Sequence, residues 1–261
     1  KGKVFVHGKE VHFKSVGDAI NGGIGYLTED RKVVGLALPQ AVEDNVLSCV
    51  IDKKSTRGLF KTKKHGELVD EKIHEMSVYP ADRSRLVSSF SGGNQQKVLM
   101  SKWLATDVDI LILDEPVDGL DPVMRRQIWS IILSEVAEKE MTVLVSSHNL
   151  RELEDVCDHV GIMHHGKIMI ERSLSDLQGS VSKIQVACQS GMPKLPEHFQ
   201  VLHMANTGRV YTMIVKGDPK EAEAALSYCN PTIVDVLPLT LEEIFIYEMG
   251  GADYEVKDIL F

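Results

Sequence analysis

Short aliphatic runs alternate with stretches of helical periodicity along the first two thirds of the chain. The runs have the length of strands and almost no polar positions, and they lie at residues 24–27, 110–113 and 141–145. Such runs are typical of a parallel sheet buried on both faces. The spacing of apolar residues predicts helices at residues 15–21, 91–104, 121–139 and 150–156. This alternation of strands and helices predicts the α/β class.

Two polar residues mark where helices begin. Ser91 precedes a helical run that continues through Leu104, and a serine is a common N-cap. Asp121 is followed by Pro122, a capping side chain with proline at the first helical position. Nearer the N-terminus, residues 3–13 alternate and turn at Gly8-Lys9, which predicts a hairpin.

The pattern changes after about residue 179. Alternating segments at residues 183–188, 201–205 and 209–215 predict strands, and helices are expected to begin near Asp218 and Thr240. We therefore expect a larger α/β domain at residues 1–178 and a small C-terminal α+β domain at residues 179–261. Strand and helix order alone suggests a ferredoxin-like regulatory or dimer-supporting role for the second domain.

Composition narrows the class of protein. The 261 residues are 43% hydrophobic and 26% charged, as in a globular protein, and the net charge of −9 argues against a general nucleic-acid binder. No apolar run approaches the roughly 18 to 20 residues that span a bilayer, so membrane contact is expected only through partners. The cysteines are scattered, which fits a reducing cytosol, and they stand at Cys49, Cys157, Cys188 and Cys229.

The acidic pair Asp114-Glu115 directly follows the aliphatic run at residues 110–113. The carboxyl ends of strands are where α/β sheets bind ligands. One carboxylate could lie near Mg²⁺ while the other orients and deprotonates a water aimed at a γ-phosphate. Taken alone, the pair could equally be an acidic turn after a core strand.

Ser91-Gly92-Gly93 opens the next candidate site. Two glycines weaken the first turn of a helix, but they leave bare N–H groups at the positive end of its dipole, where a phosphate can bind. A lone Ser-Gly-Gly would more commonly be a flexible loop with a capping serine.

His148 follows the strand at residues 141–145 and the pair Ser146-Ser147. A histidine here could donate to a phosphate oxygen and hold the attacking water, although a capping histidine is the commoner case in isolation. His164-His165 lacks partners at metal-ligand spacing and is interpreted as a turn.

A phosphate-binding loop of the form G-x-x-x-x-G-K-[ST] does not occur in the sequence. The Gly-Lys pairs begin at Gly2, Gly8 and Gly166, and none is followed by Ser or Thr.

Taken in order, Ser-Gly-Gly-Asn-Gln, the strand ending Asp-Glu-Pro, Asp121 and His148 resemble the ATP-binding-cassette (ABC) transporter ATPases. The resemblance covers nearly all of residues 1–175. It implies a P-loop NTPase-like ABC sheet that lacks the P-loop segment and is N-terminally truncated, with a helical subdomain at about residues 36–90.

The resemblance also assigns roles to individual residues. Glu115 corresponds to the catalytic carboxylate, His148 to the switch histidine and Asp114 to the Walker B aspartate that serves the metal. Three motifs are expected to contact nucleotide. Glu29 stands in the position of the Q-loop glutamine, and Asp121 is the D-loop aspartate. The signature motif consists of Ser91, Gly92, Gly93, Asn94 and Gln95.

Two branches of the family are recognisable. Residues 1–116 are similar to the second cassette of ribose and galactose importers, through Tyr-Leu-Thr-Glu-Asp-Arg-Lys at residues 26–32. Residues 117–261 are similar to multidrug and bacitracin exporter ATPases, through Ser-Ser-His-Asn-Leu at residues 146–150. This pattern suggests the hypothesis of a recombined or fused chain, which one uninterrupted native gene would defeat.

The family resemblance implies the cofactors ATP and Mg²⁺, transmembrane permease subunits as partners, and a second cassette with which two ATP molecules are sandwiched. It places the chain at the cytoplasmic face of the membrane, as an energy-coupling ATPase subunit that is almost inactive alone. A catalytically silent module that dimerises with a complete cassette and donates its signature motif is the alternative. A cassette acting in translation or DNA repair fits less well, because this chain has neither the tandem cassettes of the former nor the coiled-coil or zinc insertions of the latter.

Overall fold

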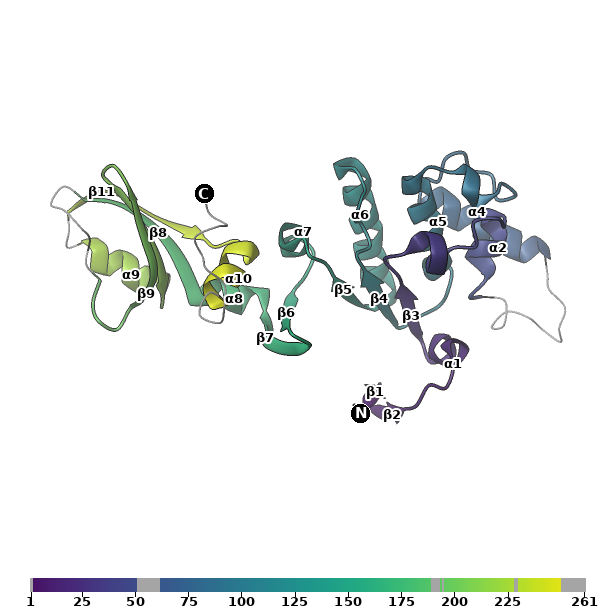
Figure 1. The fold of residues 1–261 in the computed structure, drawn as a ribbon, viewed down its shortest axis with the longest axis horizontal. Coiled ribbons are helices and arrows are strands. Elements are labelled where there is room, and N and C mark those ends of the chain that lie inside the picture. The colour runs from purple at the N-terminus through teal and green to yellow at the C-terminus, as the bar shows by residue number, and fades with distance from the viewer. Residues whose placement is uncertain (1, 51–61, 189–192, 194, 228–229, 250–261) are drawn as a thin grey trace. The chain divides into compact units, whose positions relative to one another are not determined.

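A computed structural model gives the fold and describes residues 2–50, 62–188, 193, 195–227 and 230–249. The chain divides into two compact units, residues 1–148 and residues 149–261 (Figure 1). The domain boundary expected at residues 178 and 179 stays a prediction.

A three-stranded parallel sheet organises the first unit. It consists of β3 (Ile24–Leu27), β4 (Ile110–Asp114) and β5 (Thr142–Ser146), in that order. Asp114 pairs in register with Ser146, so β4 and β5 end at one edge. The strands that the aliphatic runs predicted are confirmed, and their parallel order places the polar residues after them side by side.

The two faces of this sheet differ. Leu27, Leu111 and Leu113 are fully buried on one face, where the indole of Trp103 closes over Gly25. On the other face Tyr26 is 48% exposed and Leu144 is 61% exposed. The expectation of burial on both faces is therefore wrong for the described residues, because the helix that carries Trp103 packs on the face of Gly25, whereas Tyr26 and Leu144 are exposed on the other face.

The other elements of the first unit surround this sheet or precede it. They are β1 (Val4–Val6), β2 (Lys9–Val11), α1 (Val16–Asn21), the π-helix η1 (Arg31–Gly35), α2 (Val42–Leu47), α4 (Thr62–Glu75), the 3-10 turn η2 (Val87–Ser89), α5 (Gly92–Leu104) and α6 (Pro122–Lys139). The expected hairpin is confirmed as β1 and β2, which pair antiparallel. Both expected caps are also confirmed, since Ser91 caps α5 and Asp121 caps α6.

The second unit begins with α7 and a hairpin and continues into a four-stranded antiparallel sheet of order β11-β8-β10-β9. Its elements are α7 (Leu150–Glu154), β6 (His159–His164), β7 (Lys167–Ser173), α8 (Leu174–Ser180), β8 (Val181–Cys188), β9 (Gln200–Thr207), β10 (Val210–Lys216), α9 (Pro219–Leu226), β11 (Pro231–Pro238) and α10 (Leu241–Met249). Ile184, Met213 and Leu226 form its core, in which α9 packs on the sheet. The strands expected in this part are confirmed.

None of the helices in the described ranges is long and apolar enough to cross a membrane.

Candidate functional site

Asp114 ends β4 with its carboxylate held from both neighbouring strands. Its Oδ2 accepts a hydrogen bond from the Tyr26 hydroxyl on β3 at 2.9 Å, and its Oδ1 accepts one from Ser146 Oγ on β5 at 2.5 Å. The hydrogen bond to Asp114, with the negative charge of that carboxylate, raises the pKa of Tyr26. Hydroxyls that flank the strand end thus fix one carboxylate at the edge where ligands bind α/β sheets.

Glu115 turns sharply away from the strand, with a left-handed φ of 45°. Its Oε1 lies 2.8 Å from His148 Nδ1 and accepts a second hydrogen bond from the His148 backbone N–H, also at 2.8 Å. Its Oε2 accepts a hydrogen bond from Ser147 Oγ at 3.1 Å. The structure thus brings together the two residues that the sequence singled out as catalytic, although they are 33 positions apart.

The Ser91-Gly92-Gly93 turn opens α5, and its serine is ordered by Asn94. The Asn94 amide donates to Ser91 Oγ at 3.2 Å, while its own oxygen accepts from the Tyr79 backbone N–H at 2.9 Å. The side chain of Asn94 therefore ties the turn to the loop that precedes η2.

Both glycines of this turn are sites of close approach. A Cβ atom at Gly92 would lie 2.9 Å from a guanidinium nitrogen of Arg31, and one at Gly93 would lie 3.3 Å from the methyl group of Met124. Sequence reasoning missed Arg31, which lies in the polar segment after β3 without a motif of its own. A Cβ atom at either position would require the end of a flexible side chain to move.

Gln95 and Gln96 point inward. Gln95 donates to the carbonyls of Val87 and Phe90 at 3.3 and 3.1 Å, so its side chain closes the turn before α5. Gln96 donates to the Pro116 carbonyl at 2.7 Å. Because Pro116 follows Glu115, this last bond links the signature helix to the acidic pair, a link that the sequence pattern did not indicate.

Asp121 and Glu29 complete the residues expected at the site. Asp121 Oδ1 accepts hydrogen bonds from the Val123 and Met124 N–H groups, both at 3.0 Å, and so begins α6. Glu29 is exposed and follows the carboxyl end of β3, the same sheet edge that carries Asp114. Nucleotide contacts by these two residues stay predictions.

The fold is that of an ATP-binding cassette. A cassette solved as a dimer in a post-hydrolysis state with ADP and Pi superimposes with a TM-score of 0.58 at 19% identity, covering 67% of this chain and 74% of the other. A second solved cassette, from an ABC transporter, gives a TM-score of 0.54 at 20% identity and covers 66% of this chain and 70% of its own. The α/β ABC ATPase fold expected from the sequence is confirmed.

Residues 1–118 match the family model of the ABC transporters, so this segment resembles an ABC-type nucleotide-binding domain. A Geobacillus kaustophilus protein named for ribose/galactose/methyl galactoside import is 37% identical over 65% of this chain and 34% of its own length. The ribose import ATP-binding protein of Lactococcus lactis subsp. cremoris is 36% identical over 64% of this chain and 34% of its own length. The chain thus spans about a third of the length of these relatives. Its resemblance to sugar importers is confirmed, whereas the join of two branches stays a prediction.

Proposed function

We propose that this chain is the ATP-binding and ATP-hydrolysing part of an ABC transporter that imports a sugar. The observation that carries the proposal is the contact between Glu115 and His148 at the carboxyl end of β4, beside Asp114. A carboxylate held by a histidine and a serine, next to a second carboxylate, is suited to orient a water against a phosphate. The family match over residues 1–118 supports ATP as the nucleotide.

In this proposal the carboxylate of Glu115 accepts the proton of the attacking water. The bonds from Ser147 and from the His148 backbone hold that carboxylate in a fixed orientation, so that little reorganisation precedes the reaction. The imidazole of His148, which pairs with Glu115 through Nδ1, would donate to a phosphate oxygen.

Mg²⁺ fits the donor set at this edge. In the described part of the chain no three acidic, histidine or cysteine side chains form a cage for a metal ion. Mg²⁺ typically keeps several waters and binds through one or two carboxylates together with phosphate oxygens. Asp114 would hold the ion, which when bound neutralises charge on the phosphates.

A second cassette completes the proposed site. The Ser91–Gly93 turn presents N–H groups at the positive end of α5 and would contact the triphosphate bound by the partner. In a two-fold pair each chain lends this turn to the other. The partner is another copy of this chain or a different cassette.

Permease subunits are the other proposed partners, and a groove beside η1 is the surface we assign to them. It encloses about 340 Å³ and its lining includes Val34, Gln40, Asp44 and Lys102. Val33 and Val34 are 80% and 69% exposed on η1, a short π-helix that begins two residues after Glu29. A helix from a permease seated here would sense changes near Glu29, with the chain peripheral at the cytoplasmic face of the membrane.

Hydrolysis by these 261 residues alone is expected to be almost absent, because the phosphate-binding loop does not occur in the sequence. The alternative proposal, a silent module that only donates its signature motif, is favoured by the same observation. ATP turnover of the purified chain, of a complete sugar-importer cassette and of their mixture separates the two functions.

In the mixture, Ser91→Arg should abolish nucleotide-dependent association under both proposals, since a bulky cation fills the signature turn. Glu115→Gln should lower turnover of the mixture only if this chain hydrolyses ATP itself, and should leave it unchanged for a silent donor. If the unsubstituted chain associates in ATP neither with the cassette nor with a second copy of itself, both proposals are wrong.

A further inference from the structure

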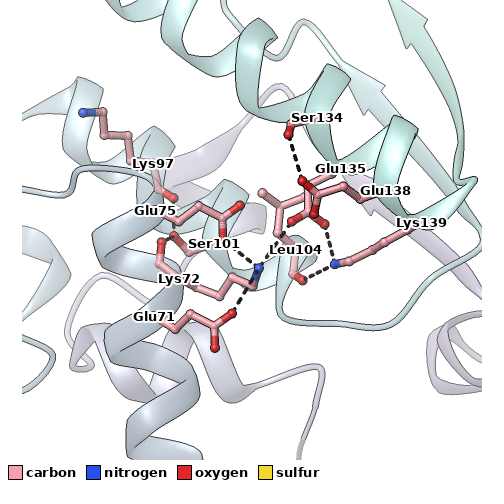
Figure 2. Close-up of polar contacts among 10 residues, drawn as sticks. All are labelled: Glu71, Lys72, Glu75, Lys97, Ser101, Leu104, Ser134, Glu135, Glu138 and Lys139. Carbon is pink, nitrogen blue, oxygen red and sulfur yellow. Dashed lines mark hydrogen bonds and ion pairs between the residues drawn. The ribbon is translucent and has the colours of Figure 1, made fainter.

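A buried cluster of charged residues joins three helices of the first unit (Figure 2). Lys72 Nζ on α4 lies 2.7 Å from Glu75 Oε2 and 3.3 Å from Glu135 Oε1 on α6. The side chains of Lys72 and Glu135 are only 9% and 6% exposed. Residues this strongly charged are almost never buried unless they are paired.

The cluster continues to the end of the signature helix. Glu135 also pairs with Lys139 one turn later, and Lys139 Nζ donates to the Leu104 carbonyl, the last residue of α5, at 3.5 Å. Figure 2 shows these side chains converging between the helices. The proposed catalytic chemistry uses none of them.

Two further bonds tie α4 to α5. Lys97 Nζ on α5 donates to the Ser77 carbonyl, just after α4, at 2.8 Å. Ser101 Oγ donates chiefly to the Lys97 carbonyl at 2.9 Å and lies 3.4 Å from the Lys72 carbonyl. Thus hydrogen bonds link α4 to α5. On α6, Glu135 pairs with Lys72 of α4, and Lys139 donates to the end of α5.

Both members of the central pair are held in their charged forms. Burial opposes the charge of Lys72, but its hydrogen bond to Glu75 and the attraction of Glu135 outweigh burial and raise its pKa. Burial likewise opposes the charge of Glu135, but Lys139 and Lys72 together lower its pKa.

A buried ion pair gives little net stability compared with apolar residues of similar volume, and in several systems such pairs specify one arrangement instead. Here the pair lies at the C-terminal end of α5, opposite the Ser91 turn. An α-helix of 13 residues is about 20 Å long, so a tilt of about 5° at one end moves the other by roughly 1.7 Å. A misplacement of about 1 Å can cost about 100-fold in rate where reacting groups must be aligned.

We propose that the ion pair between Lys72 and Glu135 sets the orientation of α4 and α5 relative to α6. It thereby fixes the distance between the Ser91–Gly93 turn and the acidic pair Asp114-Glu115, which precedes α6 in the chain. Lys72 and Glu135 are positioning residues, and the use of that distance for two triphosphates rests on the proposed function.

The two tryptophans of the chain provide the test, because Trp103 lies on α5 and Trp129 on α6. Fluorine NMR of the full chain labelled with 5-fluorotryptophan should give one narrow resonance for each. In Lys72→Met/Glu135→Leu the apolar pair restores packing, and Glu75 and Lys139 can reach water since they are 31% and 38% exposed. We expect this variant to keep its unfolding midpoint while both resonances split or broaden about two-fold, because two orientations become populated.

Lys72→Arg keeps the pair and should retain both narrow resonances. Lys183→Met breaks an ion pair of 2.7 Å with Glu243 in the second unit and should leave them unchanged. Narrow, unsplit resonances in Lys72→Met/Glu135→Leu would overturn the proposal. Because the spectra need neither nucleotide nor a second cassette, they decide this question even if the proposed association fails.

Discussion

Glu115 combines a proposed chemical role with an unusual backbone. Its φ of 45° lies in the left-handed region, which costs an L-residue other than glycine about 1–2 kcal/mol. The hydrogen bonds from Ser147 and His148 offset this cost and require a carboxylate at the position. The residue is therefore held by these hydrogen bonds and not by its backbone preference.

Replacing Glu115 by Ala and by Gly separates these two contributions. Both variants lose the carboxylate, but only glycine relaxes at positive φ, so Glu115→Gly should be about 1 kcal/mol more stable than Glu115→Ala. The measurement is the free energy of unfolding in urea. The matched control is Ser130, exposed within α6, where Gly should instead be about 1 kcal/mol less stable than Ala. Equal stability of the two Glu115 variants would contradict the argument.

Glu243 makes stability depend on pH. Burial opposes its charge, but the hydrogen bond from Lys183 at 2.7 Å and that from the Thr240 N–H at 3.0 Å outweigh burial and lower its pKa. A carboxyl group with a depressed pKa contributes stability above its unfolded pKa and loses it as the pH falls through the folded value.

Unfolding midpoints of the full chain should therefore fall as the pH drops below the ordinary range of a glutamate, and Lys183→Met should flatten this fall. Arg151→Met is the control, because the pair between Arg151 and Glu242 is largely exposed and such pairs contribute little. A pH profile unchanged by Lys183→Met would show that Glu243 does not drive it.

At the scale of elements, what the sequence predicted depended on local signals. Serine and Asp-Pro caps located α5 and α6, and aliphatic runs located the parallel strands, because these preferences act within a few residues. The shared sheet edge of Asp114 and His148 followed from the parallel order. The side-chain contacts between these elements join residues that are distant in the sequence, and no local pattern specifies them.

Three such contacts show the limit. Arg31 lies against Gly92, Gln96 donates to the Pro116 carbonyl, and Lys72 pairs with a glutamate 63 positions away. The π-helix η1 was likewise not expected, since it begins at a polar residue and carries two exposed valines.

Those valines give a prediction for η1. Val33→Asp/Val34→Asp should leave the free energy of unfolding within about 0.5 kcal/mol of that of the unsubstituted chain, since both side chains are exposed. It should weaken binding to permease subunits at least about tenfold, because a carboxylate would be buried against an apolar helix. Binding to permease in detergent micelles measures this, with Val16→Asp, equally exposed on α1, as the control. Undiminished binding would place the permease contact elsewhere.

At the scale of the molecule, the motifs and the fold belong to different extents of the chain. The family match covers residues 1–118, whereas His148 ends the first compact unit. The candidate site is contained within that unit, since Asp114, Glu115 and His148 all lie in it. The second unit has its own core around Ile184 and Met213.

The bare side of the parallel sheet has a practical consequence. Tyr26, Ile112 and Leu144 stand in one row across three strands, and water reaches the outer two freely. Apolar rows of this kind adhere to dyes, column resins and each other. Preparations of these residues should therefore become less monodisperse as the protein concentration rises during purification.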